Sequence, residues 1–354
     1  MTHTLIIGSG ITGATLAYEC AQRGDRVTIL SAHPAGGLAS AASFGWINAS
    51  FYHSPAHFAL RVAGMQAHRR LSAKLNSLPT QWPGCLWYED EGAAQDEMAQ
   101  RLLALGYSVQ PQTRAQIAAR LPDLRPVPET ALLFTDEGFA HPAILARALI
   151  AVCGAEVVET TVSELTTTDA GVTGVQTDAG PIAADRVVLA GGIGSPALLA
   201  PLGLTLPMLD RPGLILTTAP VPPICPLILA TPIQEVRQDA QGRLWAPASA
   251  SHQSDTATHL ETLPEWMEET TLARLQTLFP AVTITAQGHV AANRPVPGDG
   301  LPVAGPSRIP GLWIAVMHSG ATLAPAVAAL LAAEMHGGPQ SALLAEFRPA
   351  RFGL

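Results

Sequence analysis

The sequence predicts an α/β fold, and the observations that predict it lie at the two ends of the chain. At the start, an apolar run at residues 5–7 leads directly into glycine, a helical run follows at 14–22, and a second apolar run follows at 27–30. Near the end, an apolar run at 312–316 passes through glycine into an apolar helical run at 323–335. Strand, glycine turn and helix in this order indicate βαβ units around a parallel sheet.

The first apolar run leads into Gly8, Gly10 and Gly13, which form a G-x-G-x-x-G motif with Ile11 and Thr12 inside it. Gly8 permits a tight turn, Gly10 lets the backbone approach a pyrophosphate, and Gly13 lets the helix pack closely on the strand. The phosphate would lie at the positive N-terminus of that helix. The motif therefore predicts a Rossmann-like dinucleotide site, with a glycine-rich turn that binds no ligand as the alternative.

The end of the second strand departs from the usual pattern. A carboxylate about 20 residues after the motif usually accepts both ribose hydroxyls, and this chain has Ser31 there. We expect the Ser31 hydroxyl to make at most one ribose contact. An NADP-dependent enzyme is a weaker interpretation, because Ser31 tolerates a 2′-phosphate but His33 is the one basic residue nearby.

Composition limits the classes of function. The 354 residues are enough for two domains, and the 14% charged and 48% hydrophobic residues fit a compact enzyme with a large core. The net charge of -8 provides no basic stripe for a nucleic acid partner. The uncharged stretches at 187–209 and 309–333 contain glycines and prolines, so we expect buried strands, turns and helices there and no transmembrane segment.

The four cysteines, Cys20, Cys85, Cys153 and Cys225, are scattered, without a CxxC motif or histidines at metal-ligand spacing. We therefore expect reduced thiols and no metal site. The first residues are a strand and a glycine loop, not a charged region before an apolar helix, so we expect no signal peptide and a cytoplasmic location.

The middle of the chain alternates between two kinds of pattern. Residues 79–135 look irregular, whereas residues 208–290 hold alternating segments typical of an antiparallel sheet. Between them, residues 141–192 return to helix, strands and glycines. The expected helices are 55–75, 94–105, 142–153 and 268–278, and a loop of small residues is expected at 34–45.

Four segments spread over nearly the whole chain carry a resemblance to a known family. They are GSGITGATLAYECAQRGDRVTIL at 8–30, HPAILARAL at 141–149 with GVTGVQTDAGPIAADRVVLAGGIGS at 171–195, NRPVPGDGLPVAG at 293–305, and HSGATLAPAVAALLAAEM at 318–335. Together they resemble the flavin-dependent oxidoreductases of the D-amino acid oxidase, glycine oxidase and sarcosine oxidase family. The third is similar to the family's R-P-x-x-x-D-G-x-P-x-x-G signature, which has no counterpart in ordinary nicotinamide dehydrogenases.

This resemblance implies a Rossmann-like, glutathione-reductase-like FAD-binding domain with an inserted substrate domain, whose antiparallel sheet covers the flavin. The implied FAD-binding domain comprises residues 1–78, 136–207 and 291–354, and the implied substrate domain comprises residues 79–135 and 208–290. Sarcosine-oxidase-like relatives attach flavin through a cysteine, but Cys225 stands in no matching motif. We therefore expect noncovalent FAD.

The resemblance also implies two candidate catalytic residues. Relatives that oxidise amino acids hold the substrate carboxylate with an arginine at the position of Arg294, a task that suits the bidentate guanidinium. A structural salt bridge to Asp299 is the alternative. His318 stands just before the last helix, where it would tune the flavin or take a proton from a substrate ammonium, and a buried structural histidine is the alternative.

The last helix is expected to contact the flavin through its first residues, Gly320, Ala321, Thr322 and Leu323. Its positive N-terminus would stabilise the anionic reduced flavin, and helix capping by Ser319 or Thr322 is the compatible alternative. The other expected cofactor contacts are Gly8, Gly10, Ile11, Thr12, Gly13, Ser31, Ser40, Ala41, Ser43, Val162, Gly191 and Gly192.

These features predict an oxidoreductase that removes hydride from the carbon beside nitrogen in an amino acid or related amine, with oxygen or a quinone as the electron acceptor. Two alternatives stay open. One is a 2-hydroxy acid dehydrogenase on the same fold, and the other is a flavin-binding subunit of a multi-subunit dehydrogenase that contributes little chemistry alone. The identity and chirality of the substrate do not follow from the sequence.

Overall fold

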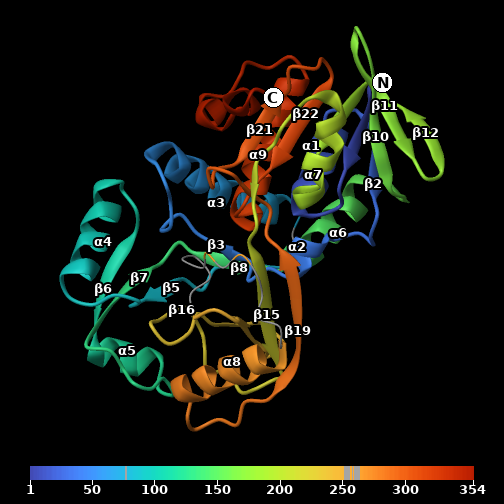
Figure 1. Ribbon diagram of the computed structural model, residues 1–354. Helices are drawn as coiled ribbons and strands as arrows, with labels where there is room; N and C mark the ends of the chain where they lie inside the picture. The colour runs from blue at the N-terminus through green and yellow to red at the C-terminus, as the bar shows by residue number, and fades with distance from the viewer. Residues whose placement is uncertain (76–77, 251–255, 257, 259–263) are drawn as a thin grey trace.

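The computed structural model describes residues 1–354 except 76–77, 251–255, 257 and 259–263. Its first layer is a six-stranded sheet in the order β21-β22-β13-β1-β2-β9, seen in the upper half of Figure 1. The strands from β22 to β9 are parallel, and β21 pairs antiparallel with β22. Their bounds are β1 His3–Ile7, β2 Arg26–Ser31, β9 Glu156–Glu159, β13 Arg186–Leu189, β21 Val303–Pro306 and β22 Leu312–Val316.

Helices cover one face of this sheet. Helix α1 (Ile11–Ala21) packs against α6 (Pro142–Cys153) and α9 (Gly320–Met335), and α9 packs against α3 (Pro55–Leu75). Proline at the first turn of α6 and left-handed Gly154 (φ 66°) after its end bound that helix where the sequence predicts it. The predicted helix at 323–335 begins one turn earlier, at Gly320.

The other face of the sheet packs against an antiparallel meander of β10 (Val162–Thr168), β11 (Gly171–Thr177) and β12 (Gly180–Ala183). Gly180 (φ 112°) begins β12 directly after the turn at 178–179. The chain then returns through β13 to the short helices η1 (Gly192–Gly194), α7 (Ser195–Leu199) and η2 (Ala200–Leu202).

Two four-stranded sheets form the lower half of Figure 1. One is antiparallel, as predicted for 208–290, and contains β17 (Arg237–Gln238), β18 (Leu244–Pro247), β15 (Pro212–Thr218) and β19 (Ala286–Asn293). The other contains β16 (Ile228–Ala230), β5 (Cys85–Trp87), β7 (Thr130–Phe134) and β6 (Val109–Thr113). Helix α8 (Pro264–Leu278) packs against β19.

The prediction that residues 79–135 are irregular is wrong, because they supply three strands of the second sheet. Strand β16 pairs in parallel with β5, so two segments distant in sequence share one sheet. Helices α4 (Ala93–Ala104) and α5 (Arg114–Arg120) pack beside β6 and β7. The predicted loop at 34–45 also contains a helical turn, α2 (Leu38–Ala41).

Short strands and terminal helices complete the described elements. They are β3 (Trp46–Ile47), β8 (Gly138–Ala140) and β4 (Thr80–Gln81) in one antiparallel sheet, β14 (Met208–Leu209) and β20 (Val296–Pro297) in another, and the 3-10 helices η3 (Ala342–Phe347) and η4 (Pro349–Phe352).

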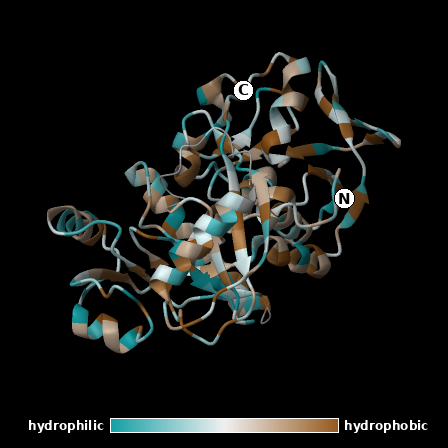
Figure 2. Ribbon diagram, turned by 60° about the horizontal axis from the view of Figure 1, so that its bottom comes forward, coloured by the Kyte–Doolittle hydropathy of each residue, from teal (hydrophilic) through white to brown (hydrophobic). Residues whose placement is uncertain are grey.

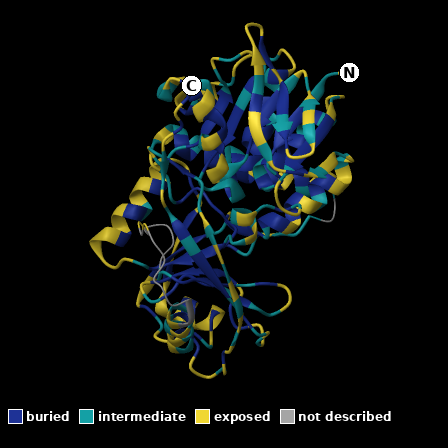
Figure 3. Ribbon diagram, turned by 45° about the vertical axis from the view of Figure 1, so that its right-hand side comes forward, coloured by how far each residue is buried: buried dark blue, intermediate teal, exposed yellow. Residues whose placement is uncertain are grey.

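One apolar core joins the two halves of the molecule. It runs from Leu16 on α1 and Leu331 on α9 to Phe134 on β7, and all three side chains are fully buried. Brown, hydrophobic segments follow the strands in Figure 2, and Figure 3 shows those strands as mostly buried between exposed helix faces. The long strands β15 and β19 extend toward the edge of the parallel sheet, where the site lies.

Candidate active site

A cavity of about 980 Å³ lies between the parallel sheet and the antiparallel sheet of β15 and β19. The carboxyl ends of four strands open into it, represented by Ile7 at the end of β1, Ser31 at the end of β2, Gly191 after β13 and His318 after β22. Ligands of open α/β sheets bind outside the carboxyl ends of the strands, and small-molecule sites span about 300 to 1,000 Å³. The topology therefore places a ligand site in this cavity.

The glycine motif forms the floor at one end of the cavity. Gly8 has a left-handed backbone (φ 111°), and a Cβ atom there would overlap the carbonyl oxygen of Ala190. A Cβ atom at Gly13 would overlap the carbonyl oxygen of Gly8, so Gly13 lets α1 pack closely on β1. At Gly10 a Cβ atom would lie 3.1 Å from Ser40 Oγ, in the space where backbone can approach a phosphate.

Two serines hold this floor in place. Ser40 Oγ accepts a hydrogen bond of 3.1 Å from the amide of Ile11, the first residue of α1. Ser31 Oγ donates to the carbonyl oxygen of His33 at 2.8 Å and lies 2.8 Å from Ser9 Oγ. Because the Ser31 hydrogen is directed at His33, the hydroxyl offers a ribose only acceptor capacity.

The N-terminus of α9 lines the cavity beside the glycine motif, where a Cβ atom at Gly320 would lie 3.5 Å from Ile11 and Thr12. Gly320 and Ala321 line the cavity, and Ser319 precedes them with a left-handed backbone (φ 57°). Neither alternative cap forms, because Ser319 Oγ accepts from Arg61 and Thr322 Oγ1 donates to the carbonyl oxygen of Trp46 at 3.1 Å. The first turn of α9 therefore presents its partial positive charge to the cavity.

Arg61 lies behind that helix end, and the sequence prediction missed it. Its guanidinium donates to Asn48 O (3.0 Å), Asn48 Oδ1 (2.5 Å) and Ser319 Oγ (3.0 Å), and it lines the cavity. Burial lowers the pKa of Arg61 to about 10, so the side chain stays charged at neutral pH. A Cβ atom at Gly64 would overlap the carbonyl oxygen of Thr322, so α3 approaches α9 closely.

The sequence spacing of the buried residues on α3 could have identified Arg61. Residues 57, 61, 64, 68 and 71 recur at intervals of three or four, and all of them are buried. Charged residues are almost never fully buried without a partner, so an arginine on this stripe indicates a bonded group within the protein.

Glu137 is a second buried charged group that the sequence prediction missed. It accepts hydrogen bonds of 2.8 Å from Trp46 Nε1 and from the Tyr107 hydroxyl. Burial raises the pKa of Glu137 to about 7, although these hydrogen bonds and the charge of Arg61 oppose the change. Glu137 thereby fixes the indole ring of Trp46, a residue that lines the cavity.

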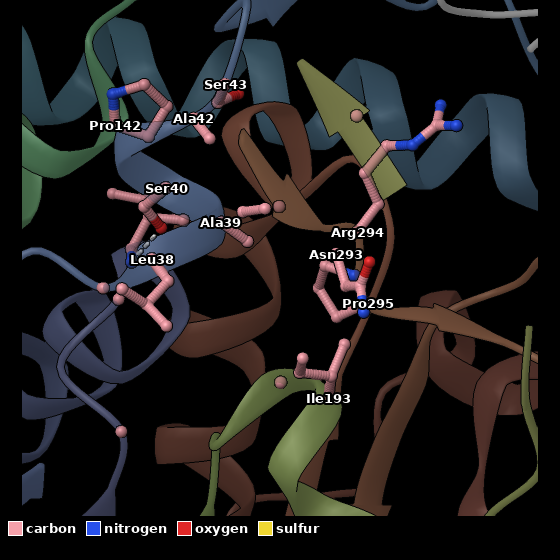
Figure 4. A pocket seen from close by; sticks show the side chains of 18 of the residues that line it. Leu38, Ala39, Ser40, Ala42, Ser43, Pro142, Ile193, Asn293, Arg294 and Pro295 are labelled. Carbon is pink, nitrogen blue, oxygen red and sulfur yellow. Dashed lines mark hydrogen bonds between the residues drawn. The ribbon is translucent and has the colours of Figure 1, made fainter. Parts of the chain in front are cut away.

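Arg294 lines the cavity directly after β19, on the side formed by the antiparallel sheet. Its Nε donates to the carbonyl oxygen of Arg211 at 3.1 Å and its Nη2 donates to that of Pro212 at 3.4 Å. The alternative partner, Asp299, is bonded to Arg351 at 2.7 Å, and the Arg294–Asp299 salt bridge does not form. Figure 4 shows Arg294 and Pro295 across the opening from Leu38 and Ser40.

The cavity has an apolar wall beside Arg294, to which Leu214, Ile215, Trp266 and Met267 contribute. None of the described residues that line the cavity is an aspartate or a glutamate. Three arginines are among the described residues that line the cavity: Arg61, Arg274 and Arg294. These cationic side chains attract negatively charged groups such as carboxylates and phosphates.

Most of the predicted site residues meet at this one cavity. Those that line it are Gly8, Gly10, Ile11, Thr12, Ser31, Ser40, Ser43, Val162, Gly191, Gly192, Arg294, His318, Gly320 and Ala321. Four others do not line it. Gly13 packs α1 on β1, Ala41 borders a smaller neighbouring cavity, and Thr322 and Leu323 are fully buried in α9.

Two further observations concern the rest of the described chain. No group of acidic, histidine or cysteine side chains among the described residues is arranged to hold a metal ion. In the same part of the chain, no helix is both long enough and apolar enough to cross a membrane.

The fold and the site define a class, namely α/β proteins that bind a dinucleotide at the carboxyl ends of a parallel sheet beneath an antiparallel sheet. The glycine floor fits a pyrophosphate, and the positive end of α9 fits the electron-rich end of a flavin. Residues 3–334 match the model of the DAO family, described as FAD dependent oxidoreductase, and the chain belongs to this family. It is therefore an FAD-dependent oxidoreductase.

Curated relatives resemble the chain over different lengths. A D-amino acid dehydrogenase of Cereibacter sphaeroides is 34% identical over 148 residues, which cover 42% of this chain and 34% of that protein. The chain thus matches about a third of that relative's length. Glycine oxidase of Pseudomonas aeruginosa is 26% identical over 353 residues, covering 95% of both chains.

Solved structures confirm the fold. The chain is similar to glycine oxidase from Geobacillus kaustophilus, with a TM-score of 0.87 and 23% identity over 99% of both chains. The predicted α/β fold with an FAD-binding Rossmann-like domain is therefore confirmed. The residue boundaries of the two domains and the roles of individual site residues stay predictions.

Proposed function

We propose that this chain oxidises the carbon–nitrogen bond of an amino acid or a related amine. The α-carbon loses hydride, the amine becomes an imine, and water converts the imine to a carbonyl compound with release of ammonia or an amine. Bound FAD supplies the two-electron acceptor for the hydride. The observation that carries this proposal is the continuous cavity that joins the glycine floor, the N-terminus of α9 and Arg294.

Arg294 is the residue that would fix the substrate. Its guanidinium plane is set by hydrogen bonds to the carbonyl oxygens of Arg211 and Pro212. A guanidinium held in this way binds a carboxylate with defined direction. The apolar wall at Leu214 and Ile215 would then take the substrate side chain and exclude water from the reacting carbon.

The N-terminus of α9 has a complementary task in the same cavity. Gly320 and Ala321 present the first turn of the helix to the cavity, and no acidic side chain stands in that turn. The partial positive charge there stabilises negative charge that develops when two electrons reach the site. The names of two relatives, D-amino acid dehydrogenase and glycine oxidase, support the same chemistry.

Steady-state kinetics of Arg294 variants test the proposal. Arg294→Ala should raise KM for amino acid substrates by roughly 10- to 100-fold, because a hydrogen bond to a charged group contributes about 1.5–3 kcal/mol. Arg294→Lys should lie between the wild type and Arg294→Ala, since lysine keeps the charge and loses the fork. The matched control is Arg308→Ala, because Arg308 is exposed and lies outside the cavity.

The products decide between this reaction and the oxidation of a 2-hydroxy acid. The proposal predicts one ammonia or amine for each carbonyl product formed. A carbonyl product without ammonia or amine, or an unchanged KM in Arg294→Ala, would contradict it.

A further inference from the structure

Ser319 lies between two polar side chains at the N-terminus of α9. Arg61 Nη1 donates to Ser319 Oγ at 3.0 Å, and His318 Nδ1 lies 3.2 Å from the same oxygen. Ser319 is the one non-glycine residue with positive φ among the described residues. Such a backbone is unfavourable for residues with a side chain and persists only where the surroundings fix it. Here the carbonyl oxygen of Ser319 accepts from the amides of Thr322 and Leu323, at 2.9 and 3.0 Å.

The direction of the Arg61–Ser319 hydrogen bond is determined by chemistry. A guanidinium has only donors, so the Ser319 oxygen must be the acceptor in that bond. The guanidinium cannot turn away easily, because its Nε and Nη2 donate to the backbone and side-chain oxygens of Asn48. Arg61 is also fully buried, and nearby Glu137 acts to raise the pKa of its guanidinium against the effect of burial.

The direction of the second bond follows from the first. The Ser319 hydroxyl has one hydrogen, and Arg61 cannot accept it. The partner of the hydroxyl that can accept it is His318 Nδ1. In the neutral imidazole, an Nδ1 that accepts leaves the hydrogen on Nε2. If the ring is protonated, Nε2 carries a hydrogen as well.

We propose that Arg61 and Ser319 are positioning residues that keep a hydrogen on Nε2 of His318, so that His318 acts on the molecule in the cavity as a hydrogen-bond donor and not as a base. This inference rests on the proposed function and chooses between the two roles that the sequence left open for His318. His318 lines the cavity beside the N-terminus of α9. The donor therefore adds to the positive end of the helix, where it stabilises a carboxylate or developing negative charge.

Amide substitutions of His318 separate the two roles. The amide nitrogen of glutamine reaches close to the position of Nε2 and donates, whereas asparagine reaches only the position of Nδ1, and neither amide is a base. We expect His318→Asn to lose roughly tenfold more kcat/KM than His318→Gln, the value of one hydrogen bond. Equal and large losses in both variants would show that His318 acts as a base and overturn the inference.

Nitrogen NMR of the FAD-loaded enzyme, labelled with ¹⁵N-histidine, reads the tautomer directly. His318→Gln identifies the His318 signals by their disappearance. The wild type should show the hydrogen on Nε2, and Ser319→Gly, which keeps the left-handed backbone without the hydroxyl, should show a mixture of tautomers. Arg61→Lys keeps a cationic donor beside Ser319 and should keep the Nε2–H form, whereas Arg61→Met should lose it.

An Nδ1–H form in the wild type, or no change in Ser319→Gly, would overturn the inference. The NMR result does not depend on the reaction catalysed, so failure of this inference and failure of the proposed function are distinguishable. A wild type that forms no ammonia or amine refutes the proposed function, whereas the Nε2–H signal decides the state of His318 by itself.

Discussion

Replacing Glu137 with glutamine should remove a pH dependence from the unfolding free energy. Glu137 has no exposed surface, and burial raises its pKa from 4.5 to about 7. In the folded chain the carboxyl stays protonated up to nearly neutral pH, whereas in the unfolded chain it ionises near pH 4.5. Because the unfolded state then binds fewer protons, the stability of the wild type falls as the pH rises through this range.

The size of the effect follows from linkage. The difference between 4.5 and about 7, at 1.36 kcal/mol for each pKa unit, corresponds to about 3 kcal/mol in full. Between pH 5 and pH 8 the wild type should lose about 2.5 kcal/mol of this, because part of the titration lies below pH 5. Glutamine does not titrate, so Glu137→Gln should not show this loss.

The substitution is conservative in hydrogen bonding. The glutamine oxygen can accept from Trp46 Nε1, and its amide can donate to the Tyr107 oxygen, which already accepts from the amide of Ala49 at 3.2 Å. The Tyr107 hydrogen can then turn to Met65 Sδ, which lies 3.8 Å away. We therefore expect Glu137→Gln to fold, with its main effect on pH dependence.

Urea denaturation at pH 5 and pH 8, with the same excess of FAD, measures the effect. From pH 5 to pH 8, the unfolding free energy of the wild type should fall by about 2.5 kcal/mol more than that of Glu137→Gln. Glu91→Gln is the matched control, because Glu91 is exposed, and its pH dependence should equal that of the wild type. Equal pH dependence in Glu137→Gln and the wild type would refute the reasoning.

Three further substitutions test other parts of the site. Gly10→Leu fills the space beside Ser40 Oγ and should abolish retention of FAD on purification. Gly288→Leu is the control, because no atom lies within 4 Å of a Cβ added at Gly288, and this variant should retain FAD. Yellow Gly10→Leu protein would contradict the placement of the FAD pyrophosphate at the glycine motif. Thr322→Val removes the hydroxyl that accepts from the buried backbone N–H of Asn48, and it should lower the unfolding free energy by about 1–3 kcal/mol in urea titrations. An unchanged unfolding free energy would show that this hydrogen bond contributes nothing. Ser31→Glu supplies a carboxylate for both ribose hydroxyls and should lower the Kd for FAD roughly tenfold in fluorescence titrations, so an unchanged or higher Kd would place the ribose elsewhere.

Local sequence patterns were sufficient for the parts of the fold that form from neighbouring residues. The strand, glycine turn and helix at β1 and α1 carry their own signals, and so do the proline and glycine at the two ends of α6. The sheet of β16, β5, β7 and β6 carries no such signal. Strand β5 has only three residues, and its partner β16 lies more than a hundred residues further along the chain. Pairing of this kind depends on tertiary contacts.

The same distinction applies to the site. Glycines and small residues that let a ligand approach were found, because the chemistry of such a loop is local. Arg61 and Glu137 were missed, since a lone charged residue is usually exposed. Their burial depends on the approach of α3 to α9 and on the position of Trp46, which the structure alone provides.

The most direct test of the central claim is the anaerobic loss of flavin absorbance in the purified, FAD-loaded enzyme when candidate substrates are added. The panel comprises glycine, D- and L-amino acids, N-methyl amino acids and 2-hydroxy acids of matched side chains. The account predicts that at least one amino acid or N-methyl amino acid bleaches the flavin and that the matched 2-hydroxy acid does not. Bleaching by 2-hydroxy acids alone, or by no member of the panel, would contradict it.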